Sequence, residues 1–233
     1  MLTHRPTLAR VIAAALFAAA TFGCSTKHTV APVASSPAPP PNTPANVVKR
    51  IEWDWQHRDT HYMSLLTDDF RFVFAEGDSG SGQWNYTPWD RVVESSAIYA
   101  MFDAGSLPPR LVSFSFDLDP TFDTMPDPRP GKDPKWHKAI RSHVNVVADL
   151  DLGSGLERRV ITGGSLFFLV RGDSAMIPPD LVLEGVRPDS TVWWLERWED
   201  ETLVGPLRPA PIQAFTLGHL KWLFVPPPRG PAR

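Results

Sequence analysis

The chain has 233 residues, of which 42% are hydrophobic and 11% aromatic, with one cysteine and a formal net charge of −3. This hydrophobic content is enough for one medium-sized packed core, so a wholly disordered chain is excluded, and a single cysteine excludes a disulfide-stapled scaffold. The net charge is slightly negative, whereas nucleic-acid-binding proteins usually carry an excess of basic residues, so no nucleic-acid partner is expected.

Residues 1–23 have the pattern of a secretory signal peptide. Arg5 and Arg10 precede an uncharged apolar run of about 12 residues, too short for a permanent transmembrane helix. Gly23 then precedes Cys24. This ending resembles the lipobox of bacterial lipoproteins, which implies that Cys24 is lipidated, becomes the mature N-terminus and anchors the chain to a membrane of the cell envelope. The alternative is a plain signal peptide that leaves Cys24 as an idle thiol.

Proline-rich segments flank the part of the chain that can fold. Residues 24–45 contain six prolines and few large apolar side chains, which predicts an extended tether. Residues 225–233 have the same character and are predicted to be a disordered tail. The folded domain is therefore expected over residues 46–224.

The first half of this domain is predicted to be mainly helical. The clearest start signal is Thr87 followed by Pro88, because Thr favours the N-cap and Pro the first helical position. The elements expected in order are a helix from an Asn46 N-cap to about Asp59, a shorter helix capped by Thr60, a strand over 70–75, a Gly- and Ser-rich loop over 76–86 and a helix over 88–103.

The second half is predicted to consist of strands and one short terminal helix. Apolar residues alternate over 112–118 and 140–150, and further strands are expected over 159–171 and 191–200 before a helix over 216–224. No helix is expected between the late strands, which favours an antiparallel sheet and an α+β fold. In the strand predicted over 159–171, Gly163 and Gly164 suggest a bulge or bend. In the strand predicted over 191–200, one face is expected to carry Val192, Trp194 and Trp198. The other face is expected to carry Trp193 and Leu195.

Three phrases of the sequence carry a family resemblance: YMSLLTDDFRFVF, TPWDRVVESSAIYAMF and VWWLERWED. Together with the order of the elements, they resemble the nuclear transport factor 2-like superfamily, also called SnoaL-like or cystatin-like cones, over about residues 46–200. The resemblance implies a curved antiparallel sheet wrapped around the N-terminal helices to form a conical pocket. Members include steroid isomerases, dehydratases, polyketide cyclases and binding or dimerisation modules, so the fold does not choose a function.

Two side chains are weak candidates for a general base. Isomerase or dehydratase chemistry needs a carboxylate or histidine that faces an apolar cavity, where burial shifts its pKa toward the working pH. Glu196 lies between two tryptophans in the last strand, and His143 lies on a long strand. Glu196 can equally be half of a buried ion pair, with Arg141 or near Arg197, and that structural role is favoured.

The leading hypothesis is a non-catalytic, membrane-tethered lipoprotein whose cone binds a small apolar ligand or an envelope protein. An enzyme using Glu196 or His143 and a homodimerisation module are the alternatives; exposure of Trp193 or Trp198 would favour the dimer. No cofactor or metal is expected, since His57 and His61 have ligand spacing but no third ligand nearby. The residues expected to line the ligand site are Trp55, Tyr62, Phe72, Phe114, Phe167 and Trp194.

Overall fold

The computed structural model describes residues 36–75, 87–103, 105, 107–202 and 215–225. The predicted signal peptide, Cys24, the predicted loop over 76–86, most of the predicted tether and nearly all of the predicted tail lie outside these residues. All the helices and strands below belong to one compact unit that begins at Ala38. Within the described ranges, no helix has both the length and the apolar character needed to cross a membrane.

The first helix, α1 (Pro44–His57), begins earlier than predicted. The Thr43 side chain, not Asn46, is the N-cap, and its hydroxyl accepts a hydrogen bond from the Asn46 backbone N–H at 3.1 Å. Pro44 fits the first turn of a helix because its missing N–H is not needed there. The following helix, η1 (Thr60–Leu65), is a 3-10 helix, and its cap is Asp59 rather than the predicted Thr60.

A short strand replaces the predicted start of the next helix. Strand β1 (Leu66–Val73) pairs with β2 (Trp89–Asp90) in antiparallel register, with Phe72 opposite Trp89. Burial of Trp89 favours this pairing over one more turn of helix. Helix α2 (Arg91–Phe102) therefore starts at an Asp90 cap, whose carboxylate accepts from the Val93 N–H at 2.9 Å.

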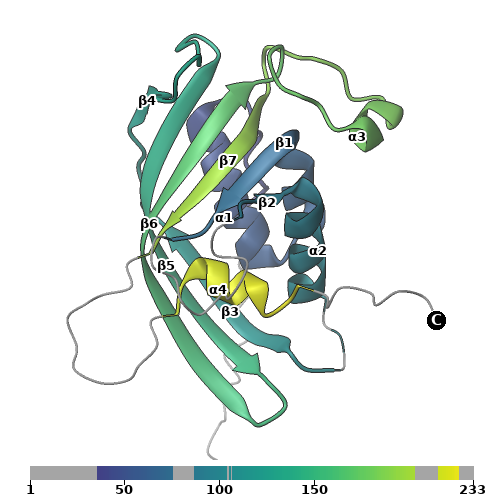
Figure 1. Ribbon diagram of the computed structural model, residues 1–233, viewed down its shortest axis with the longest axis vertical. Helices are drawn as coiled ribbons and strands as arrows, with labels where there is room; N and C mark the ends of the chain where they lie inside the picture. The colour runs from purple at the N-terminus through teal and green to yellow at the C-terminus, as the bar shows by residue number, and fades with distance from the viewer. Residues whose placement is uncertain (1–35, 76–86, 104, 106, 203–214, 226–233) are drawn as a thin grey trace, which may run out of the picture. The chain divides into compact units, whose positions relative to one another are not determined.

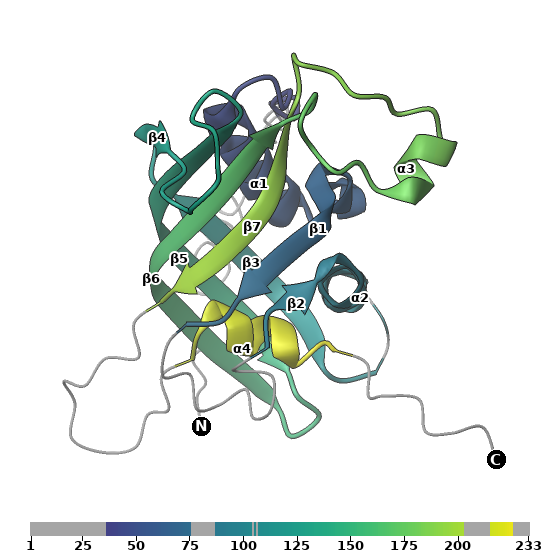
Figure 2. The ribbon, with the colours of Figure 1, turned by 45° about the horizontal axis from the view of Figure 1, so that its top comes forward.

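The remaining elements complete a curved sheet, and Figures 1 and 2 show α1 and α2 on its concave side. The strand order is β2-β1-β7-β6-β5-β3, with β4 paired to β5 off this path. All the strand pairs are antiparallel except β1 with β7, which are parallel. The α+β fold with a curved, mainly antiparallel sheet around N-terminal helices is thus confirmed. The bounds of these remaining elements are β3 (Arg110–Leu118), β4 (Thr124–Pro126), β5 (His137–Asp151), β6 (Leu156–Arg171), α3 (Pro179–Leu183), β7 (Trp193–Glu201) and α4 (Leu217–Trp222).

An irregularity in the pairing of β6 with β7 changes which residues face the core. The register shifts between Phe168 and Leu169, so that their β7 partners, Arg197 and Leu195, flank Glu196. The predicted alternation in β7 is therefore wrong: Trp193, Leu195 and Trp198 all join the main buried cluster, and Trp194 does not. The sequence suggests a bulge or bend at Gly163 and Gly164; β5 and β6 pair without a register shift through both glycines, so this pairing has no bulge there.

The outer edge of β3 is hydrogen-bonded by side chains of α1 and its C-cap. Gln56 donates to the carbonyl of Phe116 at 2.9 Å, and Glu52 accepts from the N–H of Leu118 at 2.8 Å. Arg58 follows α1 in a left-handed conformation, with φ of 52°, and donates to the carbonyls of Leu111 and Val112. Backbone groups that an edge strand leaves unpaired are thus satisfied from within the same chain.

Candidate functional site

Aromatic side chains fill the concave side of the sheet. Trp55, Tyr62, Phe72 and Phe167, all predicted to line a ligand site, are fully buried, and Phe114 packs half-buried against the same cluster. Trp198 lies at the centre, with its ring centroid 5.4 Å from that of Trp55, 5.8 Å from Phe72 and 5.0 Å from Phe167. Trp194, the sixth predicted residue, is buried outside this cluster. Five of the six predicted lining residues therefore belong to the packed core around Trp198.

Three polar side chains meet inside this aromatic core, and we call them the buried ionic centre: Tyr62, Glu94 and Lys221. Glu94 Oε1 accepts hydrogen bonds from the Tyr62 hydroxyl at 2.9 Å and from Lys221 Nζ at 2.7 Å. All three residues are 0% exposed. They come from η1, α2 and α4, so the centre links three elements that are distant in sequence.

The ammonium of Lys221 is also surrounded by aromatic rings. Its Nζ lies 3.5 Å from the ring centroid of Phe72, 4.1 Å from that of Trp198 and 5.2 Å from that of Trp55. Ring faces carry partial negative charge, so they stabilise a cation that has lost its water. One carboxylate and three aromatic rings thus take the place of the water that would surround the Lys221 ammonium in solution.

Burial shifts the pKa values of this centre. Burial lowers the pKa of Lys221 to about 8, although nearby Glu94 and Asp200 oppose that shift. Burial, with the adjacent Glu94 charge, also raises the pKa of the Tyr62 hydroxyl well above its ordinary value. A lysine and a tyrosine that share a carboxylate could exchange protons with a substrate, but none of the three groups is exposed, so within the described structure no substrate can reach them.

Asp200 attaches the last helix to the sheet beside this centre. Its carboxylate accepts from the Gly218 N–H at 2.8 Å and from both the N–H and the hydroxyl of Thr202. Burial raises the pKa of Asp200 despite these hydrogen bonds. Gly218 is required here, because a Cβ at this position would lie 2.4 Å from the Phe74 ring. The contacts hold α4, and with it Lys221, against the core.

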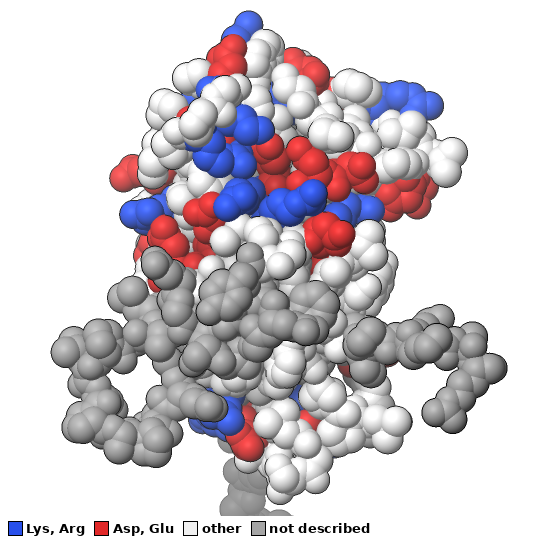
Figure 3. Space-filling view, viewed as in Figure 1, with Lys and Arg blue, Asp and Glu red and all other residues white. Residues whose placement is uncertain are grey.

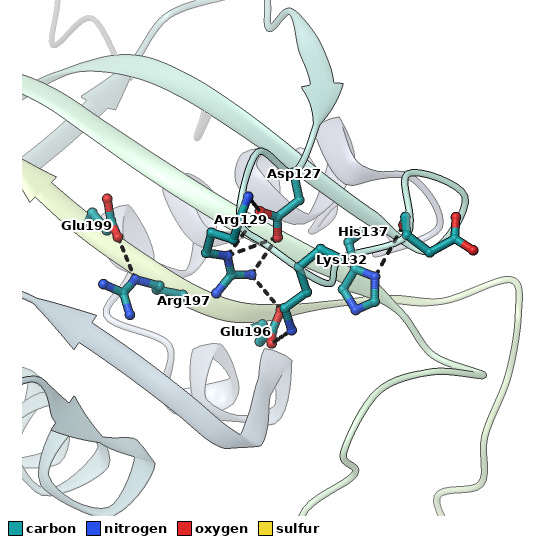
Figure 4. Close-up of polar contacts among 8 residues, drawn as sticks. Asp127, Arg129, Lys132, His137, Glu196, Arg197 and Glu199 are labelled. Atoms are coloured by element: carbon teal, nitrogen blue, oxygen red, sulfur yellow. Dashed lines mark hydrogen bonds and ion pairs between the residues drawn. The ribbon is translucent and has the colours of Figure 1, made fainter.

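Glu196 lies outside the core, in a group that we call the outer ionic cluster: Asp127, Arg129, Lys132 and Glu196 (Figure 4). Glu196 Oε2 accepts from Arg129 at 2.8 Å and Oε1 accepts from Lys132. Arg129 also pairs with Asp127 at 2.6 Å and lies over the Phe168 ring at 4.2 Å. Glu196 therefore has the ion-paired role that the sequence favoured, but with Arg129 and Lys132 instead of Arg141 or a group near Arg197.

His143 does not face the core either. It is exposed on β5, whose core-facing side chains include Val144 and Val146, and its backbone N–H donates to Asp119. The same sheet carries surface ion pairs between Arg197 and Glu199 (2.5 Å) and between Arg141 and Glu201 (2.8 Å). Figure 3 shows basic and acidic side chains interleaved in a band across the view. The two residues predicted as bases thus lie away from the buried interior.

A pocket of about 360 Å³ opens where α2 and α4 end, and we call it the rim pocket. It falls within the size range of small-ligand sites, which are concave and mainly apolar. Helix α2 contributes Ala100, and the Asp103 that follows this helix lines the pocket as well. The other lining residues are Gly105, Leu107, Pro109, Leu223, Phe224 and Val225.

Neither the buried ionic centre nor the rim pocket was predicted from the sequence. A signal for the first was present: Glu94 shares a helical stripe with buried Ile98 and Met101, and Lys221 shares one with buried Leu217. A charged residue on an apolar stripe indicates a buried partner. The rim pocket had no such signal, because its walls come from segments that are more than 100 residues apart.

Comparisons with known proteins bear on the fold. No protein-family model and no curated protein matches this sequence. Among solved structures, a nuclear transport factor 2-like superfamily protein from Salmonella enterica matches with a TM-score of 0.41 and 10% identity, covering 71% of this chain and 94% of that chain. A conserved protein from Planctomyces limnophilus matches with a TM-score of 0.42 and 17% identity, covering 66% and 88%. A candidate scytalone dehydratase from Novosphingobium aromaticivorans matches with a TM-score of 0.40 and 10% identity, covering 66% and 76%. One of these solved structures is thus named as a nuclear transport factor 2-like protein.

Proposed function

We propose that this protein is a membrane-tethered lipoprotein of the bacterial cell envelope whose domain binds a small apolar ligand in the rim pocket without catalysing a reaction. The rim pocket carries this proposal, because six of its eight lining residues are Ala, Leu, Pro, Phe or Val. Apolar walls of this size favour a ligand that leaves water for an apolar surface. Tethering rests on Cys24 and the signal-like residues before it.

The filled core is a second reason to favour binding over catalysis. A general base must come within hydrogen-bonding distance of the proton that it removes. Glu196 is paired with two cations, His143 is on the surface, and the buried ionic centre is closed. The isomerase or dehydratase alternative therefore has less support than a binding role.

The dimer alternative has less support as well. It called for a tryptophan exposed on the sheet, but Trp193 is 9% exposed and Trp198 is 0% exposed. Charged pairs on β7 and β5 also lie where an apolar dimer face would be needed.

Binding of the fluorescent apolar probe N-phenyl-1-naphthylamine tests the proposal. The full chain carrying Cys24→Ser is used, so that no lipid anchor or detergent competes for the probe. We expect saturable fluorescence enhancement, and we expect Ala100→Trp to weaken binding by roughly ten-fold because the indole fills the pocket. Val92→Trp is the matched control, since Val92 is 70% exposed on the same helix and does not line the pocket.

Two outcomes would count against the proposal. Absence of saturable binding would remove the apolar-ligand role. Equal weakening by Ala100→Trp and Val92→Trp, or no weakening by either, would show that the probe binds elsewhere on the protein.

A further inference from the structure

The rim pocket has one ionisable side chain among its lining residues, Asp103. The other lining residues have apolar side chains, except Gly105, which has none. A ligand that fills this space therefore meets apolar walls over most of its surface and a carboxylate at one place. Such an arrangement selects for a molecule with two chemically different ends.

The structure holds the Asp103 carboxylate beside the pocket. Asp103 is the C-cap of α2; its N–H donates to the carbonyl of Tyr99 at 2.9 Å, and its backbone leaves the helix in an extended conformation. Its Oδ2 lies 3.9 Å from the position that a Cβ on Gly105 would take, so the carboxylate lies against the pocket lining. Asp103 is exposed, so its carboxylate is accessible from solvent.

The surroundings add further negative potential at this point. The pocket opens at the C-terminal end of α2, a 12-residue helix, where the aligned peptide dipoles place partial negative charge. No lysine, arginine or histidine lines the pocket. An anionic group at this position would be repelled, and a cationic group would be attracted.

We infer that the ligand of the rim pocket is a cationic amphiphile, with an apolar body against the pocket walls and an ammonium or similar cation at Asp103. This inference rests on the proposed binding function and names the class of ligand. Because Asp103 is near solvent, its charge gives modest discrimination between head groups while the apolar walls supply most of the affinity.

Three probes with the same eight-carbon chain separate these contributions: n-octylammonium, 1-octanol and octanoate. Each is titrated against bound N-phenyl-1-naphthylamine at low ionic strength. We expect octylammonium to bind about two- to five-fold more tightly than octanol, and octanoate to bind most weakly. Added salt should reduce the difference between octylammonium and octanol, because exposed charges are screened.

Asp103→Asn should remove the preference for octylammonium over octanol. Asp123→Asn is the control, because it makes the same change at an exposed aspartate that does not line the pocket, and it should keep the preference. Equal affinities for the three probes, or tightest binding of octanoate, would overturn the inference about the head group and leave the apolar pocket intact. Octanol binding that is insensitive to Ala100→Trp would instead overturn the proposed function itself.

Discussion

Lys221 shows how one residue can depend on its whole environment. Among the described residues, it is the one basic side chain that is fully buried. Its charge is compensated by Glu94 and by the rings of Phe72 and Trp198. Removing one partner of a buried ion pair leaves the other charge without compensation, which costs more than the pair itself contributes.

Lys221→Met is therefore expected to lower the free energy of unfolding by about 3–5 kcal/mol, because Glu94 then remains buried without a cation. In the double variant Lys221→Met/Glu94→Gln this penalty should be smaller than the sum of the two single losses, since no buried charge is left. Urea denaturation of the wild type and the three variants measures the coupling. Strictly additive losses would mean that the two side chains act independently.

Because the carboxyl group of Asp54 is buried, we expect the free energy of unfolding to depend on pH. Its side chain is fully buried on α1, and burial raises its pKa from 3.8 to about 6, although Arg50 opposes the shift. The folded state then binds a proton more tightly than the unfolded state. This contribution to stability is fully present below pH 3.8 and is lost as the pH rises through 6.

Asp54→Asn removes this titration. The stability of the variant relative to wild type should rise by as much as about 3 kcal/mol between acidic and neutral pH. Urea denaturation over this range measures the difference, with Asp123→Asn as an exposed control that should show little trend. A relative stability that is constant with pH would show that Asp54 titrates normally in the folded protein.

At the scale of elements, the segment between β3 and β5 is held to the sheet by the outer ionic cluster. Arg129 and Lys132 belong to this segment, and both bind Glu196 in β7. Arg129 also stacks on Phe168 in β6. Glu196 in β7 and Phe168 in β6 thus both hold this connection against the sheet.

Glu196→Gln should lower the free energy of unfolding by about 1–2 kcal/mol, because the neutral amide has one acceptor oxygen where the carboxylate has two, so one of the two cationic donors loses its acceptor. Backbone amides in residues 127–136 should exchange faster, as measured by hydrogen–deuterium exchange. Glu201→Gln is a matched change in the same strand, and its loss should be smaller because its partner Arg141 has a side chain that is 61% exposed. Unchanged exchange in residues 127–136 would show that Glu196 does not hold this segment.

The sequence predicted these elements where local patterns determine them. Alternating apolar residues predicted the strands β3 and β5, and the predicted positions of α1, α2 and α4 were close to those observed. The parallel pairing of β1 with β7 was not predicted, because it joins strands more than 100 residues apart. The irregularity at Glu196 was missed for a related reason: a single sequence does not show where the register of a strand shifts.

The candidate site was less predictable than the fold. Trp55, Tyr62, Phe72 and Phe167 have the aromatic character of a ligand site and also of a core, and composition does not distinguish the two roles. Their full burial against Trp198 places them in the core. The rim pocket depends instead on where α2 and α4 end relative to each other, which is a property of the assembled fold.

At the scale of the whole molecule, the proposed anchor gives a direct prediction. In a bacterium that processes lipoproteins, the chain should fractionate with membranes and carry a lipid on Cys24, which mass spectrometry of the N-terminal peptide detects. Cys24→Ser should release the protein into the soluble fraction, whereas His28→Ser in the predicted tether should leave it in the membrane. An unmodified Cys24, or membrane association that survives Cys24→Ser, would contradict lipid anchoring.

The hydrogen bonds between α1 and β3 have a consequence for how copies of the chain behave when crowded. An open sheet edge is a template on which another chain can add a strand, and this is a common route to aggregation. Here Gln56, Arg58 and Glu52 already occupy backbone groups of β3. Strand addition at β3 would first have to break these bonds, so this edge of the sheet resists pairing with a strand of a neighbouring copy.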